Sequence, residues 1–136
     1  MIPPANEPVR NRTRAPKRKI PDLAVEILGL ECLDPTWESY RCHYVLLVRI
    51  SNIGSGDAGR FMVTVTDLYG GASDFLSAVW INGLKAGERI VLAFNLTLAE
   101  PCPPVTHHAL LVEADPTNAV EELREDNNAA TILVPS

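Results

Sequence analysis

The chain has 136 residues, a formal net charge of −5 and 46% hydrophobic residues, which suits one domain with a filled core. Eleven prolines against eight glycines predict many turns and few long helices. No run of about 18 apolar residues exists, which argues against a membrane span. The first four residues, Met1-Ile2-Pro3-Pro4, lack the apolar region of a signal peptide, so if the protein is exported its signal is missing from this sequence.

Residues 1–20 differ from the rest of the chain in charge and composition. They hold six Lys or Arg against Glu7, so this stretch carries +5 and the remainder carries −10. It is basic and rich in proline and offers almost no apolar material to bury, so we expect a disordered linker. It has no aromatic residue to stack on bases, and the acidic remainder argues against nucleic-acid binding. Residues 21–136 are predicted to form the single domain.

Alternating apolar residues predict strands from the start of this domain. The first strand begins at residues 23–28. The clearest one covers residues 44–51, and because both of its faces are apolar we expect it to be central in its sheet. A glycine-rich turn over residues 52–60 leads to residues 61–66, which we expect to pair with that strand in antiparallel fashion.

The same pattern continues to the end of the chain. The remaining predicted elements are, in order, a loop over 67–74 around Gly70-Gly71, a weaker strand over 75–81, a turn over 82–88, a clear strand over 90–97, and strands over 110–114 and 129–134. About seven strands with turns at short intervals predict an all-β, antiparallel β-sandwich. We expect Leu46, Val63, Phe94 and Val112 to share its interior.

Four pieces of the sequence stand in an order and spacing typical of one family. They are Pro21-Asp22-Leu23 with Val25, then Val48-Arg49-Ile50-Ser51-Asn52-Ile53-Gly54 with Asp57-Ala58-Gly59, then Gly83-Leu84-Lys85-Ala86-Gly87, and finally Asp115-Pro116, Asn118-Ala119-Val120, Glu122 and Glu125-Asp126-Asn127-Asn128. Together they resemble the CARDB domain (cell adhesion related domain found in bacteria) over residues 21–134.

This resemblance implies an immunoglobulin-like sandwich of seven strands. It implies a non-catalytic adhesion or spacer module in a secreted or cell-surface protein of bacteria or archaea. The partners it implies are other domains of a larger surface protein, or an extracellular protein or glycan ligand. We expect a monomer that does not insert into membranes and needs no cofactor.

The polar stretch over residues 115–128 is the densest group of oxygen donors in the sequence. If the strands alternate in direction, the turns over 52–60 and 82–88 lie at the same end of the sandwich. Calcium takes six to eight oxygen ligands, so one alternative is a calcium ion that orders the 115–128 loop. Its candidate ligands are Asp57, Asp115, Glu122 and Asp126. The main expectation is that these side chains bond to loop backbone and fix the turns, with no metal.

The three cysteines are Cys32, Cys42 and Cys102, and the same alternation places them at the opposite end. They form no CxxC pair, which argues against a structural zinc site. Disulfides Cys32–Cys42 and Cys42–Cys102 are equally acceptable, and three separate thiols remain open. His43 adjoins Cys42, and His107-His108 follows Cys102. A Cys/His nucleophile or metal site is therefore a further alternative, although no catalytic residue is assigned.

Overall fold

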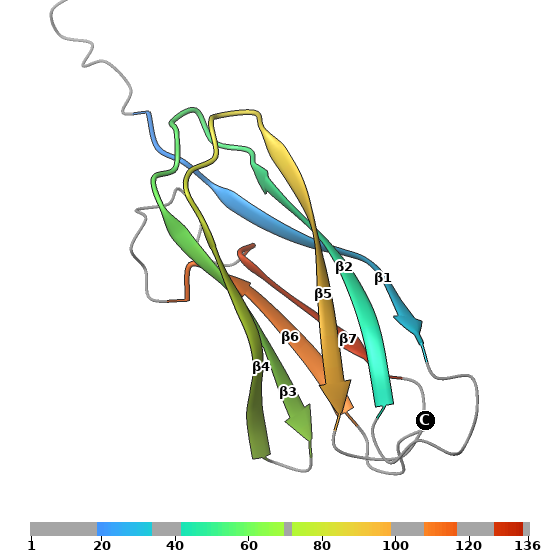
Figure 1. Ribbon diagram of the computed structural model, residues 1–136. Helices are drawn as coiled ribbons and strands as arrows, with labels where there is room; N and C mark the ends of the chain where they lie inside the picture. The colour runs from blue at the N-terminus through green and yellow to red at the C-terminus, as the bar shows by residue number, and fades with distance from the viewer. Residues whose placement is uncertain (1–18, 34–41, 70–71, 99–107, 117–126, 135–136) are drawn as a thin grey trace, which may run out of the picture.

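The computed structural model of the chain consists of two antiparallel sheets packed face to face (Figure 1). It describes residues 19–33, 42–69, 72–98, 108–116 and 127–134. One sheet has the strand order β1-β2-β5 and the other has the order β4-β3-β6-β7. The strands are β1 (Leu23–Cys32), β2 (Cys42–Asn52), β3 (Phe61–Tyr69), β4 (Ala72–Ile81), β5 (Arg89–Leu98), β6 (His108–Ala114) and β7 (Ala129–Leu133). These seven strands confirm the predicted all-β sandwich.

Strand β2 is the centre of its sheet, as the sequence predicts. It pairs with β1 on one edge and with β5 on the other, so both rows of its backbone hydrogen-bonding groups are used. Its inward side chains are buried, while Leu47 on the outer face is exposed. This alternation, with a period of two residues, makes the strand visible in the sequence.

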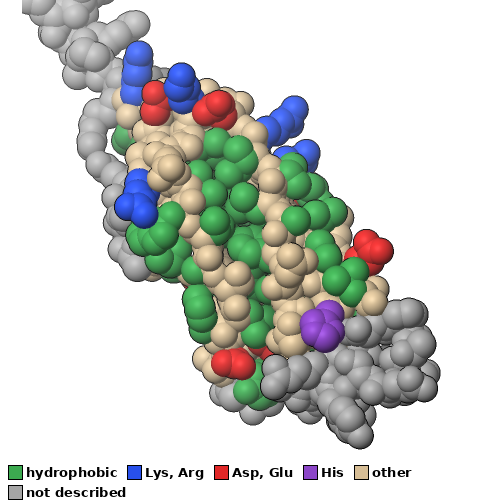
Figure 2. Space-filling view, viewed as in Figure 1, with side chains coloured by type: hydrophobic (Ala, Val, Ile, Leu, Met, Phe, Trp, Pro, Cys, Tyr) green, Lys and Arg blue, Asp and Glu red, His purple; other side chains and the backbone are tan. Residues whose placement is uncertain are grey.

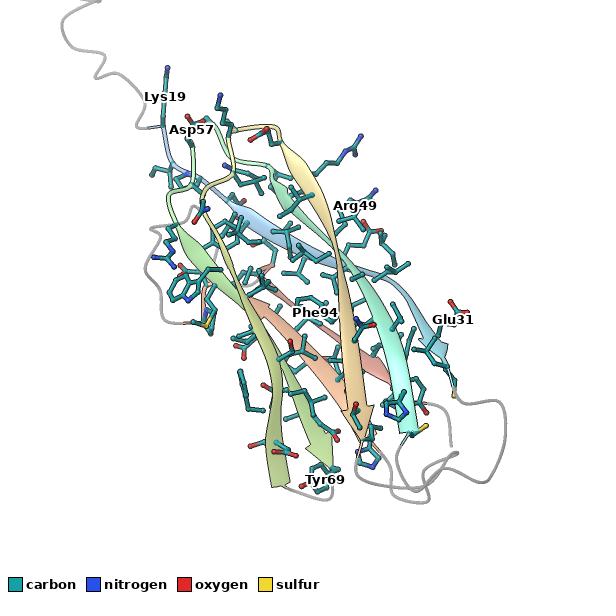
Figure 3. The ribbon with its side chains drawn as sticks, in the orientation of Figure 1. Lys19, Glu31, Arg49, Asp57, Tyr69 and Phe94 are labelled. Atoms are coloured by element: carbon teal, nitrogen blue, oxygen red, sulfur yellow. The ribbon has the colours of Figure 1, made fainter. Side chains whose placement is uncertain are left out.

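The interior contains all four residues that the alternating pattern predicts to lie there. Phe94 is labelled in Figure 3, where it lies between the two sheets, and Leu46, Val63 and Val112 belong to the same buried cluster. Burying a side chain of this size contributes roughly 1.5–3 kcal/mol. Strands β1, β2, β3, β5 and β6 each contribute buried side chains to this cluster. The other two strands contribute partly buried ones, such as Val79 of β4 and Ile132 of β7.

The expected pairing of residues 44–51 with residues 61–66 is wrong. Strand β2 lies in one sheet and β3 in the other, where β3 pairs with β4 and β6. The turn over 52–60 therefore crosses between the sheets, and its Ala58 forms a bridge with Leu84. Because both edges of β2 are occupied by β1 and β5, no edge is left for β3.

The predicted loop over residues 67–74 is also shorter than expected. Strand β3 continues to Tyr69 and β4 begins at Ala72, so Asp67 and Asp74 face each other as a strand pair. The polar residues here are therefore part of the sheet. Asp67 is buried, and its carboxylate contacts His108 inside the sandwich.

The described chain begins at one end of the sandwich and finishes at the other. Figure 3 shows Lys19 and Asp57 at the first end, which we call the Asn52 end, and Tyr69 at the second, which we call the Tyr69 end. Strand β7 finishes at the Tyr69 end, where the amide of Val134 donates to the carbonyl of His108 at 2.9 Å. Across the described ranges, no helix has the length and hydrophobicity needed to cross a membrane.

Candidate functional site

Asn52, the last residue of β2, joins three chain segments at its end of the sandwich. Its Oδ1 accepts hydrogen bonds from the amides of Asp22 and Gly54, both at 3.1 Å. Its Nδ2 donates to the carbonyls of Gly56 at 2.8 Å and Leu84 at 2.9 Å. The side chain is buried, and these four bonds use its full hydrogen-bonding capacity. One amide side chain therefore fixes the start of β1, the 52–60 turn and the 82–88 turn together.

The segment before β1 lies directly on the glycine-rich turn. The carbonyl of Ile20 accepts from the amides of Ser55 at 3.1 Å and Gly56 at 3.2 Å. A Cβ atom added at Gly54 would lie 2.3 Å from the Ile20 carbonyl oxygen, and one at Gly56 would lie 2.3 Å from that of Lys19. Both residues must therefore be glycine for the backbones to approach this closely.

We expect Gly54→Ala to lower the free energy of unfolding by about 1–3 kcal/mol, the usual cost of forcing atoms into a packed site. The added methyl group would push residues 19–22 away from the turn and expose the peptide bond after Lys19 to trypsin. The measurement is thermal unfolding together with the rate of cleavage at Lys19. Gly59→Ala is the matched control, because an added Cβ there meets nothing within 4 Å. Equal melting temperatures for the two variants would contradict this account.

Asp57 takes part in fixing the turns at the Asn52 end. Its Oδ1 accepts from the amide of Ala86 at 2.9 Å, which links the 52–60 turn to the 82–88 turn. The backbones of Ala58 and Leu84 exchange hydrogen bonds of 2.9 and 3.0 Å beside it. Glu88 Oε1 accepts from the amide of Lys85 at 2.7 Å within the second turn. The Asp57 carboxylate is thus engaged by a backbone donor.

Asp115 lies where β6 ends, in a different setting from Asp57. It is fully buried, has a positive φ of 57°, and its amide donates to the carbonyl of Met62 at 2.7 Å. The other two candidate calcium ligands, Glu122 and Asp126, lie outside the described residues. Among the residues that the structure describes, no three His, Cys, Asp or Glu side chains form a group able to hold a metal ion.

Two buried oxygens nearby were not singled out from the sequence. Asp22 Oδ1 and Asn127 Oδ1 are buried and have no hydrogen-bond partner in the structure, and Asp22 is only 3% exposed. The Asn127 carbonyl accepts from the amide of Val25 at 3.1 Å, which ties the start of β7 to β1. Both residues belong to the pieces that carry the CARDB resemblance, but an unsatisfied oxygen has no signature in sequence.

A buried polar pair occupies the interior at the Tyr69 end. His108 Nδ1 lies 2.7 Å from Asp67 Oδ2 and 2.9 Å from Oδ1, and the two side chains are 5% and 4% exposed. The Tyr69 ring packs beside the imidazole with 5.2 Å between ring centroids. The strand register explains the contact, because His108 is opposite Tyr69 and Asp67 is two residues away on the same face.

The structure does not support the alternative of a Cys/His site. Cys42 is buried and disulfide-bonded, so its sulfur is neither a thiolate nucleophile nor a metal ligand. His108 contacts the Asp67 carboxylate, and His43 is half-buried on β2. Cys32 is an exposed thiol, which excludes the Cys32–Cys42 disulfide. His107 and Cys102 lie outside the described residues.

We expect native alkylation to label Cys32 and to leave Cys42 unlabelled until the protein is reduced. The physical reason is that only a thiolate reacts, and the Cys42 sulfur is held in a disulfide. The check is mass spectrometry of peptides alkylated before and after reduction. We expect the non-reduced digest to link the Cys42 peptide to that of Cys102. Labelling of Cys42 without reductant would contradict the expectation.

Together, two antiparallel sheets of three and four strands, with turns pinned around one buried asparagine, define an immunoglobulin-like β-sandwich module. The CARDB family model matches residues 20–132. The chain therefore belongs to the CARDB family, as the sequence pieces suggested.

Two solved structures are similar to this chain over almost their whole length. The CARDB domain of a Pyrococcus furiosus protein, crystallised in complex with di-metal ions, is 26% identical with a TM-score of 0.62, and the match covers 89% of this chain and 92% of that one. A domain of a candidate cell surface protein from Methanosarcina acetivorans is 26% identical with a TM-score of 0.60, covering 86% and 92%. No curated protein sequence matches this chain.

The same fold also occurs as a small part of a much longer enzyme. A β-glucosidase from Listeria innocua matches with a TM-score of 0.51 and 16% identity, over 85% of this chain and 16% of that one. At this identity the likeness shows the fold alone. It also shows that such sandwiches occur within larger multidomain proteins.

Proposed function

We propose that this chain is a non-catalytic module that spaces domains, or adheres to a partner, in a secreted or cell-surface protein. The observation that carries the proposal is that the described residues begin at one end of the sandwich and finish at the other. Residues 19–22 are pinned at the Asn52 end, and β7 finishes at the Tyr69 end (Figure 1). A module entered at one end and left at the other holds its neighbours apart by the length of the sandwich.

The strand arrangement would also resist a force that pulls the two ends of the module apart. The first and last strands, β1 and β7, lie against each other and run in the same direction in Figure 1. A pull on the two chain ends therefore shears contacts such as the hydrogen bond from the Val25 amide to the Asn127 carbonyl. Bonds loaded in shear must break together, whereas bonds at the end of a hairpin break one at a time.

The relatives support the same proposal. The Methanosarcina acetivorans match is a domain of a candidate cell surface protein, and this chain is comparable to it in extent. We infer the same location for this chain, with other domains of its parent protein, or an extracellular protein or glycan, as its contacts.

Single-molecule pulling tests the spacer role. With handles on the two ends of the chain, we expect one abrupt rupture that releases the whole domain. Gly54→Ala is expected to lower the rupture force, because it loosens residues 19–22, and Gly59→Ala serves as its control. Gradual lengthening at forces typical of an unfolded polypeptide would contradict the proposal.

A second candidate function is cation binding, favoured by the two unpartnered buried oxygens. Buried carboxylates are normally paired or coordinate metals, and Asp22 Oδ1 and Asn127 Oδ1 have no hydrogen-bond partner. Oxygen ligands of this kind suit calcium. The Pyrococcus furiosus relative is a complex with di-metal ions. In this alternative Asp22 and Asn127 join Asp115 as candidate ligands, and Asp57 is the least suited because it holds the Ala86 amide.

Calcium titration followed by thermal unfolding tests this candidate. A ligand that binds only the folded state raises the melting temperature by mass action. We expect a rise at calcium concentrations up to about 1 mM, the weak end for extracellular modules. Asp22→Asn should reduce the rise, and Asp74→Asn on the exposed part of β4 should leave it unchanged. An unchanged melting temperature throughout the titration would rule the candidate out.

A further inference from the structure

Strand β5 is an open edge of the sandwich. It ends the three-stranded sheet and pairs only with β2 within the described ranges. The Asn52 amide donates to the Glu88 carbonyl at 2.9 Å, and hydrogen-bonded pairs recur at every second residue of an antiparallel ladder. Ile90 and the alternate residues after it therefore point their backbone groups at β2. The backbone groups of the other five point outward, and these are Arg89, Val91, Ala93, Asn95 and Thr97.

This edge lacks the features that normally protect an edge strand. Exposed edges usually carry proline, several charges or a bulge that twists them away. Strand β5 contains no proline and no acidic residue, and Arg89 at its start is its single charge. Its pairing with β2 runs without a register shift from Arg89 to Leu98, and Val91 is 59% exposed. The one charge lies at the first residue, so the rest of this edge carries no charge that would oppose pairing with another strand.

The side of the sandwich beside this edge is also apolar. Figure 2 shows hydrophobic side chains gathered in a band between β4 and β5, the two edge strands on this side. Ile90 and Leu92 from β5, and Val79 and Ile81 from β4, pack on the core but are only partly buried. A strand added to β5 would cover these side chains and use its outward backbone groups at the same time.

We propose that a second copy of this chain supplies that strand, through antiparallel pairing of β5 with β5 about a two-fold axis at Ala93. The outward backbone groups fix the register, because the hydrogen-bonded pairs must join the five outward-facing residues of each copy. Ala93 then lies opposite Ala93 of the second copy, Val91 opposite Asn95, and Arg89 opposite Thr97. One isologous contact of this kind closes a dimer.

The sequence of β5 is complementary to itself in this register. The outer-face pairs bring no two charges together, although the chain as a whole carries −5 and its copies repel. On the inner face, Ile90 lies opposite Leu96, and Leu92 opposite Phe94, so every pair is apolar. The half-buried Ile90 and Leu92 thereby gain the apolar neighbours that a single copy does not give them. The proposal goes beyond the spacer role and replaces the monomer expected from the sequence.

Sedimentation equilibrium of the full chain and its variants tests this dimer. We expect the natural sequence to dimerise with a Kd tighter than about 1 mM. Ala93→Pro removes an amide that faces outward, so it breaks the contact between copies and leaves the β2 ladder intact. Val91→Lys keeps the backbone amide and instead places a charged side chain on the edge strand, which opposes pairing. Each variant is expected to weaken the dimer at least about ten-fold, while Leu133→Lys, at an exposed leucine on β7, is the matched control and leaves it unchanged.

A cross-link gives a second readout of the register. Residues directly opposite in a hydrogen-bonded pair have Cα atoms about 5.5 Å apart, a distance that a disulfide spans. In a Cys32→Ser background, Ala93→Cys should form a covalent dimer under mild oxidation, and Leu133→Cys should not. A natural chain that stays monomeric at about 1 mM overturns the proposal. A dimer that survives both Ala93→Pro and Val91→Lys also overturns it, because another surface then holds the copies.

Discussion

Asn52→Ala is expected to lower the free energy of unfolding by about 3–5 kcal/mol, since unsatisfied buried polar groups cost roughly 1–3 kcal/mol each and do not add fully. The substitution removes two acceptor and two donor contacts at once. It leaves the amides of Asp22 and Gly54, and the carbonyls of Gly56 and Leu84, without their partner. These four backbone groups belong to three different segments, so the Asn52 end should loosen as a unit.

Chemical denaturation of Asn52→Ala and of Ser73→Ala measures this effect. Ser73 is exposed on β4, so its removal should change the free energy of unfolding by no more than about 0.5 kcal/mol. Amide hydrogen exchange adds a local readout, because protection should fall first at Gly54 and at the start of β1. A loss of stability in Asn52→Ala as small as that in Ser73→Ala would mean that water replaces the four hydrogen bonds.

The strands were predictable because each carries its own signal. The alternation in β2 and β5 follows from one buried and one outward face, and it is complete within about ten residues. The division of the strands between the two sheets was not predictable in the same way, and β2 and β3 were wrongly expected to pair. Local alternation does not distinguish a turn between neighbours in one sheet from a turn that crosses to the other sheet. The crossing at residues 52–60 depends on contacts with Leu84 and Ile20, about 30 residues away in either direction.

The candidate site was predictable only in part, for a related reason. The order of the predicted strands places the 52–60 and 82–88 turns at the same end of the sandwich. The hydrogen bond from the Ala86 amide to Asp57 confirms that these two turns are in contact. It gave no role to Asn52, although an asparagine directly before Ile53-Gly54-Ser55-Gly56 suits a side chain that bonds to its own turn. The Asp67–His108 pair was missed because Asp67 was placed in the predicted 67–74 loop and His108 was considered only together with Cys102. The burial of the two side chains depends on strand pairing between residues 41 positions apart.

A double-mutant cycle on the Asp67–His108 pair is expected to show a large coupling free energy between the two side chains. His108→Leu leaves the Asp67 carboxylate buried without the imidazole, and removing one partner of a buried pair costs about 3–5 kcal/mol. Asp67→Val should cost a similar amount. The double variant is expected to be far more stable than the sum of the two losses predicts, because replacing a whole buried pair with apolar groups is often neutral or stabilising.

The exposed ion pair between Glu26 and Arg49 provides the matched control for this cycle. Its side chains are 57% and 33% exposed, so water screens the contact, and the expected coupling is about 0.2–1 kcal/mol. A coupling for Asp67 and His108 as small as that would mean that water reaches the Tyr69 end in the folded state. A large coupling would instead show that the polar pair fixes how β3 and β6 meet beneath Tyr69. In that case a module built to keep two ends apart is held rigid by polar contacts at both of them, with Asn52 at one end and Asp67–His108 at the other.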